Sequence, residues 1–146
     1  MFKKNLVSHP KMPQEILIRR IEIPEAGTVE ADIDWLARSL GFASPRDREE
    51  TALKVFHLIV EGAVHRSGLT SEQLAAELDL TRAAVLHHIK NYIAAGLIRQ
   101  DRTLYTLRTR SLVRTLEEGE LDTQRIFSDL KKIAKEVDER LGLVAR

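Results

Sequence analysis

A helical repeat of apolar residues between Leu80 and Ile98 is the strongest pattern in the chain. The opposite positions are mostly small, polar or basic, and they contain no carboxylate. Thr81 is a favourable N-cap residue, and Gly96 can adopt the positive φ that ends many helices. The pattern therefore predicts a helix over 82–95 with one buried face. The apolar positions, at steps of one, three and four, are Ala84, Val85, Ile89, Tyr92, Ile93 and Leu97, and the opposite face carries Arg82, Ala83, Leu86, His87, Lys90 and Asn91.

A shorter amphipathic segment precedes this helix. Thr70 and Gln73 have the spacing of a capping box at its start. Its apolar stripe consists of Leu74, Ala75 and Leu78. Only residues 79–81 separate the two predicted helices, which is the length of the turn in a helix-turn-helix.

The pattern changes to alternation after Gly96. Residues 97–99 and 104–108 alternate between apolar and polar side chains, and the polar residues 100–103 lie between them. This is the pattern of a β-hairpin. Two helices, a tight turn and a hairpin predict a winged helix-turn-helix.

Basic residues concentrate in this part of the chain, although the net charge of the whole chain is only +1. Between Thr81 and Arg110 the single acid, Asp101, is set against Arg82, Lys90, Arg99, Arg102, Arg108 and Arg110. A cluster of one sign on a recognition helix and wing is the electrostatic footprint expected for a nucleic acid. A solvated face more often mixes signs.

These patterns favour double-stranded DNA as the partner. Arginine, lysine, asparagine and apolar side chains read the base edges exposed in the major groove. We expect the helix 82–95 to enter that groove and the wing, 99–108, to lie on the backbone or minor groove. Thr81, at the helix N-terminus, would hold a phosphate. The candidate DNA-binding residues are Thr81, Arg82, Ala83, Leu86, His87, Lys90, Asn91, Arg99 and Arg102.

Residues 69–108 resemble the winged-helix core of ArsR-like bacterial and archaeal transcriptional regulators. The resemblance covers roughly forty residues, and MarR-like and related regulators share much of it. It implies a sequence-specific transcriptional regulator. The matching residues are Leu80-Thr81, Val85, His87-His88-Ile89, Ala95-Gly96-Leu97-Ile98 and Leu104-Tyr105-Thr106-Leu107.

The residues upstream predict an extension of a strand and a helix, followed by the first helix of the winged domain. After an arm over 1–13, the isoleucine-rich segment 15–23, bounded by prolines, predicts a strand. Val29–Leu40 has helical spacing and ends at Gly41. Ser44-Pro45 is expected to start the next helix, which ends near Gly68. Its buried face would contain Ala52, Val55, Phe56, Ile59, Ala63 and Val64.

The C-terminal segment predicts a dimerisation helix. Residues 111–116 form an amphipathic turn that we expect Gly119 to interrupt. From Leu121 the apolar residues alternate steps of three and four, which is a coiled-coil seam. The helix either folds back on its own domain or pairs with a second copy. Pairing is favoured because symmetric dimers usually read operators. The seam residues are Phe127, Leu130, Ala134, Val137, Leu141 and Val144.

The fold class is therefore mainly α with a small β-hairpin wing, in three parts: an N-terminal extension (1–44), a winged helix-turn-helix (45–110) and a C-terminal coiled-coil-like helix (111–146). Without cysteine, and without an apolar run fit for a leader or a membrane span, we expect a cytoplasmic protein. His57 and Glu61 are expected to be an exposed pair rather than a metal site, and Trp35 to pack against the domain or a partner subunit.

We expect no catalytic residue, metal, cofactor, membrane or small-molecule ligand, since no catalytic motif is recognisable. The favoured function is a homodimeric DNA-binding regulator. The alternative is a winged helix that serves as a protein-interaction module within a larger transcription or chromosome-associated complex.

Overall fold

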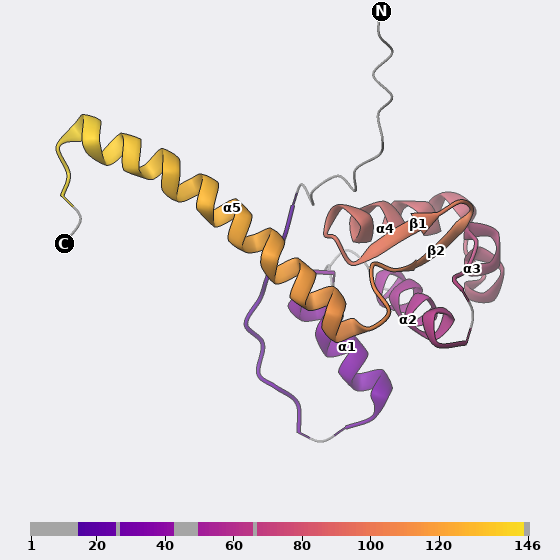
Figure 1. The fold of residues 1–146 in the computed structure, drawn as a ribbon. Helices are drawn as coiled ribbons and strands as arrows, with labels where there is room; N and C mark the ends of the chain where they lie inside the picture. Colours follow the sequence, from indigo (N-terminus) through magenta and orange to yellow (C-terminus); the bar gives the residue numbers. More distant parts are fainter. Residues whose placement is uncertain (1–14, 26, 43–49, 66, 145–146) are drawn as a thin grey trace, which may run out of the picture.

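The computed structural model describes residues 15–25, 27–42, 50–65 and 67–144, and contains five helices and a two-stranded antiparallel sheet within them. The predicted fold class, mainly helical with a hairpin after the helix-turn-helix, is confirmed (Figure 1). In chain order the elements are α1 (Val29–Ser39), α2 (Thr51–His65), α3 (Ser71–Leu78), α4 (Arg82–Ala94), β1 (Ile98–Asp101), β2 (Leu104–Leu107) and α5 (Leu112–Leu141).

One hydrophobic core joins α1, α2, α3, α4 and the hairpin. Helix α2 is its centre, since Val55, Phe56 and Ile59 are essentially inaccessible to solvent. Helix α1 contributes Ile33 and Ala37 to the same cluster. The segment expected to be an extension is therefore part of the core that supports the winged domain.

The predicted hairpin is present, but β1 extends to Asp101, so the loop is shorter than the polar tip expected over 100–103. Ile98 pairs with Leu107 and Asp101 pairs with Leu104, which leaves a loop of two residues. Arg102, the first of them, has φ 57°, as primed hairpin turns require at this position. An isolated bridge between Leu69 and Tyr105 ties β2 to the segment before α3.

The strand expected over residues 15–23 is wrong, because this segment is extended but pairs with no strand among the described residues. Among the described residues, one backbone hydrogen bond joins it to the domain, from the amide of Arg19 to the carbonyl of Ser39 at 2.6 Å. Trp35 is half-buried, and its indole donates to the carbonyl of Glu22 in this segment at 2.9 Å. Isoleucine enrichment predicted an extended conformation, but a strand also needs a partner.

Helix α2 begins later than predicted. Its first residue is Thr51, and Glu50 has φ 54°, which cannot continue a right-handed helix. The predicted start at Ser44-Pro45 falls outside the described residues. The expected burial of Val64 is also wrong, since it lies in the last turn of α2 and is 74% exposed.

Helix α5 is continuous over 30 residues, so the predicted interruption at Gly119 is wrong. A glycine in a helix costs only about 1 kcal/mol relative to alanine, and helix-forming residues flank Gly119 on both sides. Ser111 caps the helix, because its hydroxyl accepts from the amide of Arg114. The first turns of α5 lie on the domain, and the rest projects away from it (Figure 1), so it does not fold back on its own domain.

Candidate nucleic-acid interface

The helix-turn-helix is built by local capping, as the sequence predicts. The Thr70 hydroxyl accepts from the amide of Gln73, and the Gln73 side chain accepts from the amide of Thr70. Asp79 ends α3 in the left-handed conformation, and the Thr81 hydroxyl accepts from the amide of Ala84 to start α4. Each cap satisfies an amide that helix geometry leaves unpaired.

The inner face of α4 is anchored in the core by Tyr92. Its ring centroid lies 4.3 Å from that of Phe42 and 5.3 Å from that of Phe56. The Tyr92 hydroxyl donates to the carbonyl of Ala52 in α2. Because Val85 and Ile89 are buried on the same side, the rotation of α4 about its own axis is determined by the core.

The outer face of α4 presents most of the predicted DNA-binding residues to solvent. Leu86 differs, because it is half-buried and packs against the core. Residue 86 therefore has only part of its side chain available for a ligand. The exposed positions are Thr81, Arg82, Ala83, His87, Lys90 and Asn91.

The two adjacent histidines of α4 have different surroundings. His87 is exposed, whereas His88 is half-buried with its Nε2 atom 2.9 Å from the hydroxyl of Thr51 in α2. His88 therefore packs against the neighbouring helix α2. His87 thus remains available on the outer face.

Arg82 is held by the first turn of α3. Its Nε atom lies 3.2 Å from the Ser71 hydroxyl and 3.2 Å from Oε1 of Glu72. The pKa of Glu72 is lowered, chiefly by a hydrogen bond from its own backbone amide, with smaller contributions from Ser71 and Arg82 against an opposing desolvation. Side chains this exposed gain little stability from pairing. The contact orients Arg82 without preventing it from reaching a ligand.

The wing carries two of the predicted residues. Arg99 is exposed on β1, and its guanidinium lies 4.0 Å from the carboxylate of Asp101. Arg102 stands at the tip, where the side chain of Gln100 donates to its carbonyl at 2.9 Å. Within the described part of the chain, Lys90, Arg102 and Arg110 form no ion pair.

Arg108 does not belong to the exposed basic cluster that the sequence suggested. Its side chain is 20% exposed, and its guanidinium contacts the carboxylate of Asp122 and lies 3.7 Å from Glu118. Asp122, at 1% exposed, was missed from the sequence, although it follows the buried Thr115 at a spacing of seven. Such a spacing places both residues on one helix face, which is the signal that could have identified it.

His57 is also placed differently from the expectation. It is half-buried and pairs with Asp34 of α1 at 2.6 Å, not with Glu61. No group of three His, Cys, Asp or Glu side chains that could hold a metal ion occurs among the described residues.

The predicted dimerisation residues lie on one exposed face of α5, with a single exception. We call Phe127, Leu130, Ala134, Val137 and Leu141 the α5 stripe; its four large members are 45–69% exposed. Val144 lies beyond the end of the helix at Gly142, so it cannot continue the helical seam. Two heptads remain.

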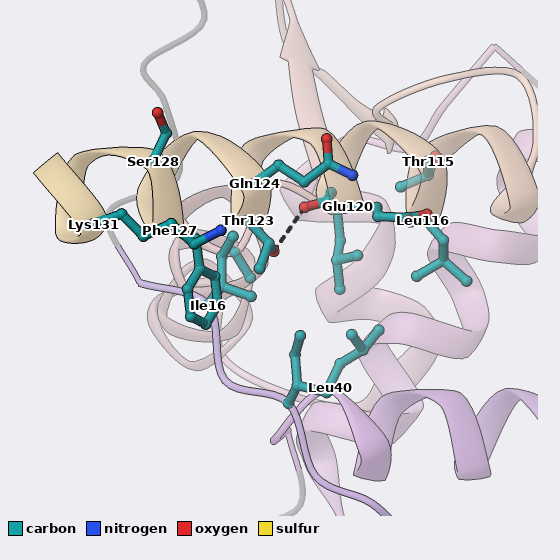
Figure 2. Close-up of a pocket in the computed structure, with 14 residues that line it drawn as sticks. Ile16, Leu40, Thr115, Leu116, Glu120, Thr123, Gln124, Phe127, Ser128 and Lys131 are labelled. Carbon is teal, nitrogen blue, oxygen red and sulfur yellow. Dashed lines mark hydrogen bonds between the residues drawn. The ribbon is translucent and has the colours of Figure 1, made fainter. Parts of the chain in front are cut away.

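A groove of about 600 Å³ lies where α5 leaves the domain (Figure 2). Phe127 forms one end of it, opposite Ile16 of the N-terminal segment and near Leu40. Leu97 and Leu116 complete its apolar lining. No pattern along the chain indicated this groove, because its walls come from four separate parts of the chain.

Comparison with protein families matches residues 51–99 to the winged helix-turn-helix DNA-binding family. The match begins at the first residue of α2 and ends in β1. It supports DNA as the partner of this domain. Neither the curated proteins nor the solved structures gave a match. Among the described helices, none has the length and apolar character that a membrane span needs.

Proposed function

We propose that this protein is a sequence-specific, homodimeric transcriptional regulator of the ArsR-like or a related type. The observation that carries the proposal is the outer face of α4, which exposes Arg82, His87, Lys90 and Asn91 and contains no acid. It lies within the region that matches a DNA-binding family. We also retain the expectation that the protein acts in the cytoplasm and has no enzymatic activity.

In this proposal α4 enters the major groove, and its first turn meets the base edges. Arg82 and Asn91 have the donors that distinguish guanine and adenine there. The capped N-terminus of α4 offers free amides to a phosphate beside Thr81. Arg99 and Arg102 of the wing contact the backbone or minor groove and contribute affinity rather than sequence readout.

Dimerisation is part of the proposal because a single winged domain binds DNA weakly. Two copies related by a two-fold axis would read two half-sites, and the exposed α5 stripe provides a surface for their association. The DNA-binding face and the α5 stripe are on different elements, so both can be occupied together.

The test is selection of bound sequences from a random duplex library with the full chain, followed by titration of the enriched duplex. The Lys90→Ala variant should bind it at least about fivefold more weakly, since a phosphate or base contact is lost. Lys132→Ala makes the same change at an exposed position of α5 and should bind like the parent.

The proposal would be overturned if the selection enriched no sequence. It would also be overturned if the Lys90→Ala and Lys132→Ala variants bound the enriched duplex with equal affinity. Either result would favour the protein-interaction module as the function of this winged helix.

A further inference from the structure

The α5 stripe is a long apolar surface on a helix that otherwise carries charge. Its large members are Phe127, Leu130, Val137 and Leu141, each at least 45% exposed. Scattered apolar residues are normal on a surface, but a continuous row marks an interface. Alternating steps of three and four fit a second helix with the same spacing, which the second copy of this chain supplies.

A second copy of α5 can pair with the first in a parallel or an antiparallel orientation. The residues that flank the stripe discriminate between these two orientations. One edge carries Gln124, Lys131 and Asp138, and the other carries Ile126, Ile133 and Arg140. In a parallel pair each edge faces the opposite edge of the partner, so Lys131 meets isoleucine and Asp138 meets isoleucine. Flanking charges set helix orientation, and the parallel pair forms no ion pair between these edges.

An antiparallel pair places each edge against the same edge of the partner. In this orientation, two registers keep the α5 stripes of the two copies in contact with each other. One of them sets Lys131 against the partner's Lys131, which is repulsive. The other sets Lys131 against the partner's Asp138, and the symmetry repeats this attraction. The second register also packs Leu130 on the partner's Leu141, and the small Ala134 on the partner's Val137.

Lys131 and Asp138 cannot satisfy each other within one helix. They are seven residues apart, which is about 10 Å along the axis. Among the described residues neither side chain forms an ion pair. Both charges are therefore available to a partner.

We propose that two copies of α5 pair antiparallel in this register, with Lys131 of each copy against the partner's Asp138. The inference rests on the proposed homodimer and specifies its interface. It directs the C-terminal end of the partner's α5, which Leu143 and Val144 follow, toward Phe127 at the mouth of the groove in Figure 2. These two residues are 60% and 85% exposed in the single chain, and the groove offers them an apolar surface.

This arrangement also sets the distance between the two winged domains. Asp122, where α5 is held to its domain, would lie about 40 Å from the partner's Asp122 along the helix axis. Successive major grooves on one side of DNA are roughly 34–36 Å apart. The antiparallel pair thus separates the two points at which α5 is held to its domain on the scale of one turn of DNA.

The first experiment reverses the charges and measures the dimer dissociation constant of the full chain by analytical ultracentrifugation. Lys131→Glu or Asp138→Lys alone should raise it at least about tenfold, equivalent to about 1.4 kcal/mol. The double variant should return to within about threefold of the parent. Lys132→Glu, a matched reversal at the neighbouring outward position, should have no comparable effect. Single variants without effect, or a double variant no better than either single, would overturn the register.

The second experiment uses the absence of cysteine in the chain. Leu130→Cys and Leu141→Cys chains are mixed and mildly oxidised. The antiparallel register predicts a disulfide between the two different chains and little within either one alone. Disulfide-linked dimers in each variant alone would show a parallel pair and overturn the proposal.

DNA binding separates this inference from the proposed function. If the cross-link joins residues 130 and 141 of different chains but no duplex is enriched, the antiparallel interface is supported and the proposed regulatory function is wrong. If the chain binds a specific duplex and is monomeric at micromolar concentration, the interface is wrong.

Discussion

Arg108, at the base of the wing, forms an ion pair with Asp122, in the first half of α5. Asp122 is fully enclosed and also lies 3.2 Å from Arg125, while Arg108 reaches the carbonyl of Gly96 at 3.5 Å. The pair therefore links three places: the end of α4, the end of β2 and the root of α5. It determines the direction in which α5 leaves the DNA-binding domain.

Removing the acid should destabilise the fold. Asp122→Asn leaves the largely enclosed Arg108 with only the more distant carboxylate of Glu118, at 3.7 Å. Breaking a buried pair costs about 3 kcal/mol. Urea denaturation should show a lower midpoint with little change in slope. Asp129→Asn, at an exposed position of the same helix, should stay within about 0.5 kcal/mol of the parent. Equal midpoints for the two variants would mean that the pair does not stabilise the fold.

Tyr92 should contribute through its hydroxyl as well as through its ring. Tyr92→Phe keeps the contacts with Phe42 and Phe56 but leaves the carbonyl of Ala52 without this donor. A lost buried hydrogen bond costs about 1–2 kcal/mol. Thermal unfolding should detect the change, and Tyr105→Phe provides a control because no hydrogen bond of its hydroxyl occurs among the described residues.

Arg82→Ala should reduce specificity more than overall affinity. A bidentate arginine–guanine contact discriminates by about 1–3 kcal/mol, so the selected duplex should lose more affinity than random DNA. Competition binding measures both. Equal losses on the two DNAs would identify Arg82 as a phosphate contact and assign the readout to His87 and Lys90.

Arg102→Ala should have the complementary effect. A contact from the wing tip to phosphate carries no sequence information, so selected and random duplexes should weaken in proportion. The slope of log affinity against log salt should fall by about one per subunit. An unchanged slope would place the wing tip away from the backbone.

A chain that ends at Ile126 should fold as a monomer. It retains Asp122 and Arg125 but loses the α5 stripe from Phe127 onward. Light scattering should report the monomer, and circular dichroism should show cooperative melting. Ending the chain before Asp122 should instead impair folding, because the partner of Arg108 is removed with the helix.

The sequence by itself determined the elements whose signals are local. The caps at Thr70 and Thr81 and the positive φ of Gly96 depend on near neighbours along the chain, and they appear where they were predicted. Helical period alone also assigned Val85, Ile89 and Tyr92 to the buried face of α4. Ile93, expected on the same face, is 37% exposed, so that part of the prediction is wrong. The alternation that predicted the hairpin is also a local signal.

Tertiary structure decided the features that depend on distant residues. Whether residues 15–23 form a strand depends on a neighbouring strand, which the described fold does not supply. Arg108 counts as exposed charge in the sequence, yet Asp122, fourteen residues later, encloses and neutralises it. The groove beside Phe127 exists only because four separate segments meet. Period and capping act over one or two turns of chain, whereas burial and charge pairing are set by which segments the core brings together.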